Sequence, residues 1–415
     1  MFVCLNPLTY KQAMKKVYTI TSSLHDEASV SALSDEFLSG VFPSGGYSFG
    51  GADFSDFGSA DLSLIYVRTG GAEGIFLQLL PQLMEKGVRD FYLLTSGKSN
   101  SLAASLEILS YLRLHGLGGE VLHGKTEYLR ERISLLEKVE TAKKALCGKR
   151  IGIIGKPSDW LIASGTDPQE VRRRTGIVME EIPMAVLLRE IEKVPEHAAV
   201  PDAPSAKEED IRASYPGAVR IYEALSAIVE RHCLDALTLR CFDLLTSVGN
   251  TGCISLSRFN SEGIPASCEG DIPALLTMMI VNAFTGISGF QANPASIDVG
   301  TGEVLFAHCT IPFNMVDRYN YDTHFESGIG VGIHGHFPEG PVTVFKVSGD
   351  LSRAFIAEGE LIGNQYEDNL CRTQVRLRID ISDARYFLTD PIGNHHIIVP
   401  GRHGELFRAF VNSCR

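Results

Sequence analysis

The order of apolar patterns along the chain constrains its fold most, because these patterns determine which kind of sheet each part can form. Short apolar runs such as SLIYV at 63–67 and DFYLLT at 90–95 alternate with helical patterns at 74–87 and 100–115. This alternation predicts a parallel sheet with helices on its faces. The run KRIGIIG at 149–155 is again β-branched and ends in glycine, which indicates the opening of a second α/β unit.

The last part of the chain follows a different period. The runs PVTVFKVSG at 341–349 and CRTQVRLRIDI at 371–381 alternate apolar and polar residues, which is typical of antiparallel strands. A chain of 415 residues is also long for a single hydrophobic core. We therefore expect an α/β domain at 14–147, a second α/β domain at 148–301 and a β-rich domain at 302–415.

The composition argues against two classes of partner. The net charge is −12 at pH 7, whereas a general nucleic-acid binder needs a basic face for the phosphates. The same charge suits an anionic membrane surface poorly. Ile272–Phe290 is uncharged, but its Thr, Asn, Gly and Ser residues favour a buried helix over a membrane span. We therefore expect no nucleic-acid partner and no membrane partner.

The cysteines indicate a reducing compartment. There are nine of them and no CxxC pair, so reduced thiols fit better than a disulfide framework. The start of the chain has no long apolar run before a small-residue cleavage site. We therefore expect a cytoplasmic location. Met14 is a plausible second start, and we expect residues 1–13 to be an extension with no role in the fold.

Two acidic residues stand directly before the long uncharged segment, in SCEGDIPALLT at 267–277. Helix capping explains Asp271, because a carboxylate satisfies free N–H groups at a helix N-terminus. Glu269 lies between an apolar strand region and an apolar helix, where a carboxylate is costly without a partner. A cation is a natural partner for Glu269.

A further carboxylate and several histidines follow. Asp298 and His308 flank a turn and a strand-like run in NPASIDVGTGEVLFAHCTIP at 293–312, and GNHHIIVPGRH at 393–403 holds two adjacent histidines. Taken alone, Asp298 is more typical of a turn and His308 of a core. Together with Glu269 they offer two carboxylates and one or two imidazoles. This set suits Mn²⁺ or another divalent cation better than a structural zinc site.

Three stretches carry a resemblance to a known family: AVRIYEALSAIVERHCLDALTLRCFDLL, GCISLSRFNSEGIPASCEGDIPALLTM and VLFAHCTIP. With GNHHIIVPG near the C-terminus, the chain resembles the L-fucose isomerase and L-arabinose isomerase superfamily. The resemblance covers most of the chain, with its strongest motifs in the second half. It implies two Rossmann-like parallel-sheet domains followed by a mostly antiparallel β domain, and a symmetric homo-oligomer, a trimer or hexamer.

The resemblance also implies roles for individual residues. Glu269 matches the family's first metal-binding and catalytic glutamate, and Asp298 matches its second acid. His308 and His396 match the histidine ligands, His396 being the second residue of the HH pair. Adjacent side chains of a strand point to opposite faces, so we expect His395 at the pocket rim or behind the ligands. The gap between Asp298 and His308 is shorter than in arabinose isomerases.

The implied activity is that of a metal-dependent aldose–ketose isomerase. It would act on a free sugar such as L-fucose or L-arabinose through a cis-enediol. Glu269 and Asp298 would alternate as base and acid across C1 and C2, while the cation polarises the carbonyl. Two alternatives stay open: an isomerase or epimerase of a modified sugar on the same scaffold, and a non-catalytic sugar-binding protein. No basic cluster is obvious, which favours an unphosphorylated sugar.

Other polar and aromatic side chains are candidates for contacts with the substrate. Asn293 could hydrogen-bond a sugar hydroxyl or form a turn with the proline that follows it. Trp160, the only tryptophan, could stack on a sugar or pack within the fold. His395 is the third candidate. The histidines of YDTHFESGIGVGIHGHFP at 321–338 fit a solvated glycine-rich turn better than a pocket loop.

Overall fold

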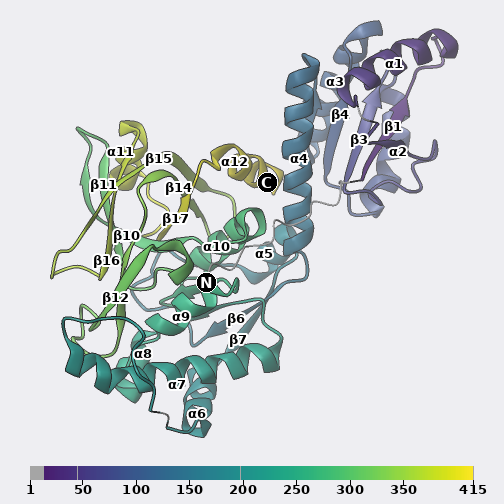
Figure 1. Ribbon diagram of the computed structural model, residues 1–415. Coiled ribbons are helices and arrows are strands. Elements are labelled where there is room, and N and C mark those ends of the chain that lie inside the picture. Colours follow the sequence, from purple (N-terminus) through teal and green to yellow (C-terminus); the bar gives the residue numbers. More distant parts are fainter. Residues whose placement is uncertain (1–13, 44, 197, 415) are drawn as a thin grey trace. The chain divides into compact units, whose positions relative to one another are not determined.

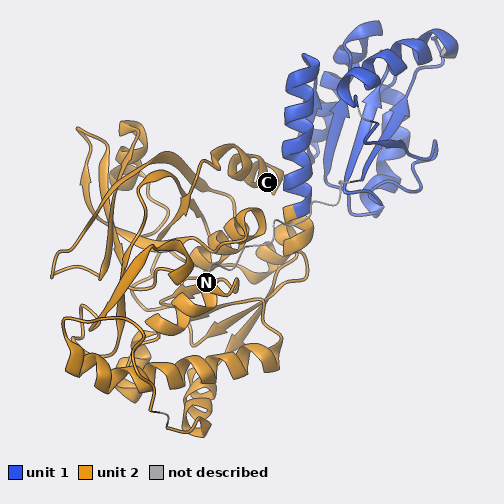
Figure 2. Ribbon diagram, viewed as in Figure 1, with its two compact units in different colours: residues 1–141, 415 blue, residues 142–414 orange. Residues whose placement is uncertain are grey.

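The computed structural model describes residues 14–43, 45–196 and 198–414 (Figure 1). The predicted extension at 1–13 therefore lies outside the described residues. The chain divides into two compact units, one ending at Thr141 and the other running from Ala142 to Cys414 (Figure 2). The division into three domains that the sequence indicates stays a prediction.

The first unit is a parallel sheet covered by helices. Its strands lie in the order β2-β1-β3-β4-β5, and every neighbouring pair is parallel. The strands are β1 (Lys15–Ile20), β2 (Ser48–Phe49), β3 (Leu62–Val67), β4 (Asp90–Leu94) and β5 (Gly118–Leu122). The helices are α1 (Glu27–Val41), α2 (Glu73–Glu85), η1 (Lys98–Asn100), α3 (Ser101–Leu114) and α4 (Thr126–Leu146). Ile65 and Val67 of β3 pack into one apolar cluster and Leu64 and Tyr66 into another, because successive side chains of a strand point to opposite faces.

The second unit begins with another parallel sheet, in the order β7-β6-β8-β9. Its strands are β6 (Arg150–Ile154), β7 (Val178–Ile182), β8 (Ala236–Leu239) and β9 (Ala266–Cys268). The helices of this part are α5 (Pro168–Thr175), α6 (Met184–Lys193), α7 (Glu208–His232), α8 (Phe242–Val248), α9 (Cys253–Ser261) and α10 (Ile272–Thr285). Both parallel sheets confirm the α/β prediction.

Helix α10 joins the two halves of the second unit. It packs against the sheet strands β8 and β9 and against the barrel strands β14 (Gly340–Val347) and β17 (His396–Pro400). Contact on several sides explains why its first ten residues are all buried, and why it is apolar all round. No helix within the described ranges is both long enough and apolar enough to cross a membrane.

Six antiparallel strands at the C-terminal end close into a barrel, in the order β10-β11-β16-β15-β14-β17. The strands not yet given are β10 (Phe290–Asp298), β11 (Glu303–His308), β15 (Ala354–Gln365) and β16 (Thr373–Ile379). A hairpin of β12 (Arg318–Asp322) and β13 (Gly332–His336), with η2 (Phe313–Met315), α11 (Ile381–Thr389) and α12 (Gly404–Ser413), completes the unit. The antiparallel prediction is confirmed. Closure leaves these strands without a free edge and buries their apolar faces inside.

The barrel register brings distant histidines to one level. Ala292 of β10 lies opposite His396, and Asn293 lies opposite Ala307. The end of β11, which carries His308, and the start of β17 therefore flank the same position of β10. Because α10 spans from this barrel to β9, the turn between β9 and α10 approaches the same end of the barrel.

Candidate metal centre

Three buried side chains from separate segments meet at this end of the barrel. The ligand atoms of Glu269, His308 and His395 all lie within 4.8 Å of one another. Oε1 of Glu269 is 3.5 Å from Nε2 of His395 and 4.0 Å from Nε2 of His308. The two imidazole rings stand nearly perpendicular, at 78°, with their centroids 5.4 Å apart. One carboxylate oxygen and two imidazole nitrogens therefore face a common point, as a divalent cation requires.

The backbone holds Glu269 in an unusual conformation. Its φ is 64°, in the left-handed region that non-glycine residues seldom occupy outside functional sites. Gly270 follows with φ 71°, and a Cβ there would lie 2.6 Å from the carbonyl oxygen of Lys156. Ser158 N donates to the Glu269 carbonyl at 2.9 Å. Only glycine fits at position 270. The tight turn formed by Glu269 and Gly270 directs the Glu269 side chain towards the histidines.

The Glu269 carboxylate is engaged on both oxygens. Trp160 Nε1 donates to Oε2 at 2.7 Å, while Oε1 faces the two histidines. Burial raises the pKa of Glu269, but the hydrogen bond and charge of His395, with smaller effects from His308 and Trp160, lower this pKa to about 2. The group is therefore an anion at neutral pH, which suits a cation ligand.

His395 is fixed by a carboxylate behind it. Its Nδ1 lies 2.8 Å from Oδ2 of Asp271, and because a carboxylate only accepts, Nδ1 carries the proton. Nε2 is buried and has no hydrogen-bond partner within the part of the chain that the structure describes. Burial lowers the pKa of His395, yet Asp271 and Glu269 outweigh it and raise this pKa to about 9. A proton on Nε2 and a cation beside it compete for the same lone pair.

His308 presents its ring in the neutral form. Nδ1 lies 2.8 Å from the Thr310 hydroxyl, which leaves Nε2 towards Glu269. Burial, followed by the charge of His395, lowers the pKa of His308 to about 3. Neutral imidazole is the form that binds metals. Glu269, His308 and His395 together fit a divalent cation.

The structure does not bring Asp298 into this centre. Asp298 is exposed at the end of β10, opposite Glu303. Its Oδ1 accepts from Gly300 N at 2.8 Å, and its carbonyl accepts from Gly302 N at 2.9 Å. It closes the β10–β11 turn away from the other predicted ligands, and its role as second acid and ligand stays a prediction.

The two adjacent histidines point to opposite faces of the strand, as predicted, but their positions are exchanged relative to the prediction. His395 faces Glu269, whereas His396 points into the barrel, because β17 starts at His396 and pairs it with the inward Ala292. His396 Nε2 accepts from the Tyr386 hydroxyl at 3.1 Å. The structure therefore brings His395, and not His396, together with Glu269 and His308, and the role of His396 as a ligand stays a prediction.

The substrate candidates occupy distinct positions. Trp160 is 50% exposed, packs edge-on against Phe242 with centroids 4.9 Å apart, and binds the Glu269 carboxylate. Asn293 has a buried Oδ1, to which no residue of 14–43, 45–196 or 198–414 donates a hydrogen bond. It lies two positions after Gln291, whose Oε1 accepts from Cys268 N at 2.7 Å, so both side chains leave β10 on the face towards β9.

Sequence reasoning missed three residues around the centre. Asp271 caps α10 as predicted, but it also binds His395. Lys346 is buried beside Asp271, with its Nζ 3.6 Å from Oδ1. Lys346 lies two residues after Val344 in a run of alternating residues. Strand alternation therefore predicts that its side chain lies on the same buried face as Val344. His324 is buried with its ring edge-on to Phe242 at 5.5 Å, so it belongs to no solvated turn.

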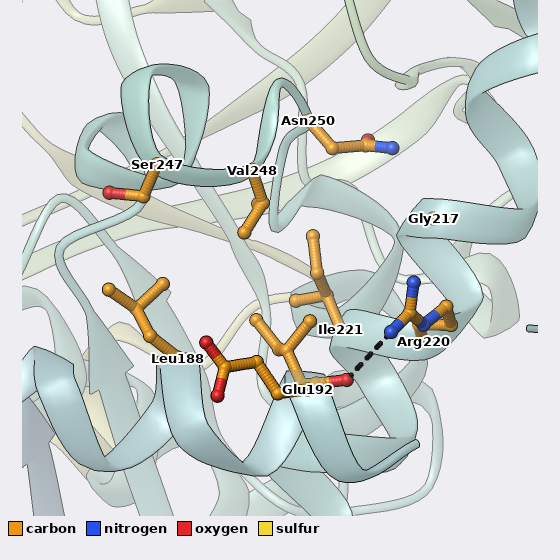
Figure 3. A pocket seen from close by; sticks show the side chains of 9 residues that line it. Leu188, Glu192, Gly217, Arg220, Ile221, Ser247, Val248 and Asn250 are labelled. Atoms are coloured by element: carbon orange, nitrogen blue, oxygen red, sulfur yellow. Dashed lines mark hydrogen bonds between the residues drawn. The ribbon is translucent and has the colours of Figure 1, made fainter. Parts of the chain in front are cut away.

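A separate cavity of about 330 Å³ lies among α6, α7 and α8 (Figure 3). Leu188, Ile221 and Val248 line it with apolar side chains. Arg220 at its edge donates to the Ile191 carbonyl at 3.0 Å, the contact drawn in Figure 3. None of the centre residues lines this cavity, so it is distinct from the metal centre.

Comparison with known proteins supports an enzyme. No protein-family model matches the chain. It is 25% identical over 304 residues to a protein named sulfoquinovose isomerase from Priestia aryabhattai, covering 70% of this chain and 68% of that protein. A protein of the same name from Alkalicoccus urumqiensis is 24% identical over 223 residues, 52% of this chain and 49% of its own length. These matches indicate an enzyme of the aldose–ketose isomerase class, as the sequence predicts.

Proposed function

We propose that the chain is a divalent-metal-dependent isomerase that interconverts the aldose and ketose forms of a modified sugar of the sulfoquinovose type. The observation that carries the proposal is the buried cluster of Glu269, His308 and His395, with the Nε2 of His395 left unpartnered. The names of the relatives support the reaction and the modified sugar. We infer membership of the L-fucose and L-arabinose isomerase superfamily on the same grounds.

Glu269, His308 and His395 would hold the cation. When bound, a divalent cation supplies Lewis-acid polarisation of the sugar carbonyl. One carboxylate with two imidazoles suits Mn²⁺ among several divalent ions, and we propose Mn²⁺ first. Asp271 keeps the His395 proton on Nδ1 and so leaves Nε2 to the cation.

Isomerisation also needs groups that move a proton between C1 and C2 of the sugar. We assign one transfer to Glu269, whose Oε2 is held in place by Trp160. Asp298 is remote, so we assign the second role to His324. Its ring is buried beside Phe242. Burial and then the charge of Arg372 lower the pKa of His324, while the charge of Glu269 opposes that shift in part, so the ring is neutral and can accept a proton. Trp160, Phe242 and His324 form a row of rings on which a sugar can pack.

The test is turnover of a sugar panel by the full chain. Sulfoquinovose, D-glucose, L-fucose and L-arabinose are each supplied with Mn²⁺ and then with EDTA, and ketose formation is followed. We expect metal-dependent turnover of sulfoquinovose, and its loss in Glu269→Gln. Glu303→Gln is the matched control, because that carboxylate lies on β11 but pairs with Arg378.

The possible outcomes separate the alternatives. Turnover of L-fucose or L-arabinose with none of sulfoquinovose would restore the free-sugar hypothesis. Turnover that persists in EDTA and in Glu269→Gln would overturn the proposed centre. Binding of the sugar without any product would favour the sugar-binding protein.

The remaining sequence-based expectations stay proposals about the whole protein. They are a symmetric homo-oligomer, a trimer or hexamer, a cytoplasmic location, and domains at 14–147, 148–301 and 302–415. Light scattering of the purified chain measures the first, and limited proteolysis at the proposed boundaries tests the last.

A further inference from the structure

A lysine is buried in the wall of the barrel. Lys346 shares the inward face of β14 with Val342 and Val344, and it is 1% exposed. Its Nζ has no hydrogen-bond partner among the described residues, and an Asp271 oxygen lies at 3.6 Å. A buried ammonium is costly unless a counter-charge compensates it. The fold therefore retains Lys346 for its charge beside Asp271.

Asp271 has more contacts than a helix cap needs. Oδ1 accepts from Ala274 N at 2.7 Å, which is the capping bond, and the same oxygen faces Lys346. Oδ2 accepts from Nδ1 of His395 at 2.8 Å. A serine or asparagine would cap α10 equally well. Neither the bond to His395 nor the buried lysine is explained by capping.

The position of α10 against β14 is fixed by a buried hydrogen bond. Val347, the residue after Lys346, donates its N–H to the Thr277 hydroxyl at 3.1 Å, and Thr277 lies about 1.7 helical turns from Asp271. Strand and helix are thus tied together where the lysine and the carboxylate meet. The contact between Lys346 and Asp271 is therefore fixed by the packing of β14 against α10, unlike a surface ion pair between mobile side chains.

The contacts form one continuous row of buried groups. Lys346 faces Asp271, Asp271 binds Nδ1 of His395, and Nε2 of His395 lies 3.5 Å from Oε1 of Glu269. When Nε2 of His395 carries no proton, as cation binding requires, the two carboxylates and one ammonium leave this row one negative charge. The only nitrogen of His395 without a partner faces the proposed cation position.

We propose that Asp271 and Lys346 are positioning residues of the centre. Asp271 holds the His395 proton on Nδ1 and the ring in one orientation, so that the Nε2 lone pair faces the cation. Lys346 holds the second Asp271 oxygen by its charge and prevents the carboxylate from rotating away from His395. This inference rests on the proposed function only in that it takes the centre to bind a divalent cation.

The test measures Mn²⁺ binding directly in the full chain. Isothermal titration calorimetry gives the Mn²⁺ affinity of the wild type, Asp271→Asn, Asp271→Ser and Lys346→Met. Asp271→Ser keeps a capping group, so a loss of affinity there separates positioning from capping. The matched control is Val344→Ala, which alters the same face of β14 without touching the row. Circular dichroism confirms that each variant is folded.

We expect both Asp271 variants to bind Mn²⁺ about 10- to 100-fold more weakly, and Lys346→Met about tenfold more weakly. Val344→Ala should stay within about threefold of the wild type. Nitrogen NMR of labelled histidines in the metal-free chain adds a second readout. At a pH above the His395 pKa of about 9, where the wild-type ring is neutral, its signal should show the Nδ1–H pattern, and this pattern should change in Asp271→Asn because the amide offers its own N–H to Nδ1.

The results for this inference and for the proposed function can be told apart. Equal Mn²⁺ affinity in wild type and folded Asp271 variants would overturn the inference while the isomerase stands. Mn²⁺ binding that the Asp271 variants weaken, without turnover of any sugar, would support the inference and overturn the proposed function. Absence of Mn²⁺ binding in the wild type would overturn both.

Discussion

His395 and His396 are neighbours in the chain, fully buried, and surrounded by opposite environments. His395 lies between the carboxylates of Asp271 and Glu269, and its pKa is raised to about 9 despite burial. His396 lies inside the barrel beside Phe355 and Tyr386, and burial with the charge of Lys346 lowers its pKa to about 3. Burial alone therefore does not determine what a histidine does. The role of each histidine depends on the groups that surround the strand face on which its side chain lies.

The largest effect on Mn²⁺ affinity and turnover should come from removing the ring of His395, and removal of the ring of His396 is the comparison. His395→Ala takes away a proposed ligand, so Mn²⁺ affinity and turnover should each fall more than about 100-fold, beyond what the loss of an outer partner costs. His396→Ala should leave Mn²⁺ affinity within about threefold. Calorimetry and product formation measure both. A loss of binding in a folded His396→Ala chain would reverse the assignment of the pair.

The pH dependence of metal-free stability should also separate the pair. The pKa of His395 is raised above its unfolded value near 6.5, so its stabilisation is complete below pH 6.5 and is lost as pH rises towards 9, on the order of 3 kcal/mol. The pKa of His396 is lowered, so its contribution is present above pH 6.5 and is lost as pH falls towards 3.

Urea unfolding at a series of pH values measures both slopes. His395→Gln should flatten the alkaline decline, and His396→Phe should flatten part of the acid decline. The rest of the acid decline should persist in His396→Phe, because the lowered pKa of Glu269 also makes stability fall with pH. An alkaline slope unchanged in His395→Gln would show that the ring is not held between the carboxylates.

A smaller effect should follow from Tyr386→Phe. The Tyr386 hydroxyl accepts from Ile392 N at 2.7 Å and donates to His396 Nε2 at 3.1 Å. Its removal leaves both groups unsatisfied and should cost about 1–2 kcal/mol of unfolding free energy. Because Tyr386 lies on α11 and contacts His396 on the inward face of β17, Mn²⁺ affinity should stay unchanged. Reduced affinity would mean that the two environments are coupled.

The smallest effect should come from Asp298→Asn. This exposed turn residue should change stability by about 0.5 kcal/mol or less, and turnover by less than about twofold. The turnover of Asp298→Asn is measured with the sugar that the wild type converts. A loss of turnover near that of Glu269→Gln would show that Asp298 acts at the centre, as the sequence predicts.

The sequence predicted the layers of the fold because periodicity reflects burial directly. Alternation of strand and helix patterns indicated both parallel sheets, and the period of two indicated the antiparallel strands. Closure into a barrel was not predictable, because side-chain alternation is the same in open and closed sheets. It depends on the pairing of β10 with β17, which lie about a hundred positions apart in the chain.

For the site, local pattern and register contributed differently. Glu269 stood out because an acidic residue between apolar segments needs a partner. The choice between His395 and His396 depended on where β17 begins and which residue it meets on β10, and a one-residue shift exchanges the faces. The position of Asp298 was not predictable for a related reason, since β10 continues as far as Asp298 and carries it away from the end of the barrel where Glu269 lies.

The position of Trp160 makes the proposed metal centre observable by tryptophan fluorescence. It is the only tryptophan in the chain, and its indole N–H is bonded to Glu269. Emission excited at the indole band therefore comes from one position, in direct contact with a proposed ligand. Arrival of a paramagnetic ion should quench that emission, and the same signal should report sugar packing on the exposed ring face. The unmodified protein thus carries its own fluorophore at the site whose occupancy is in question.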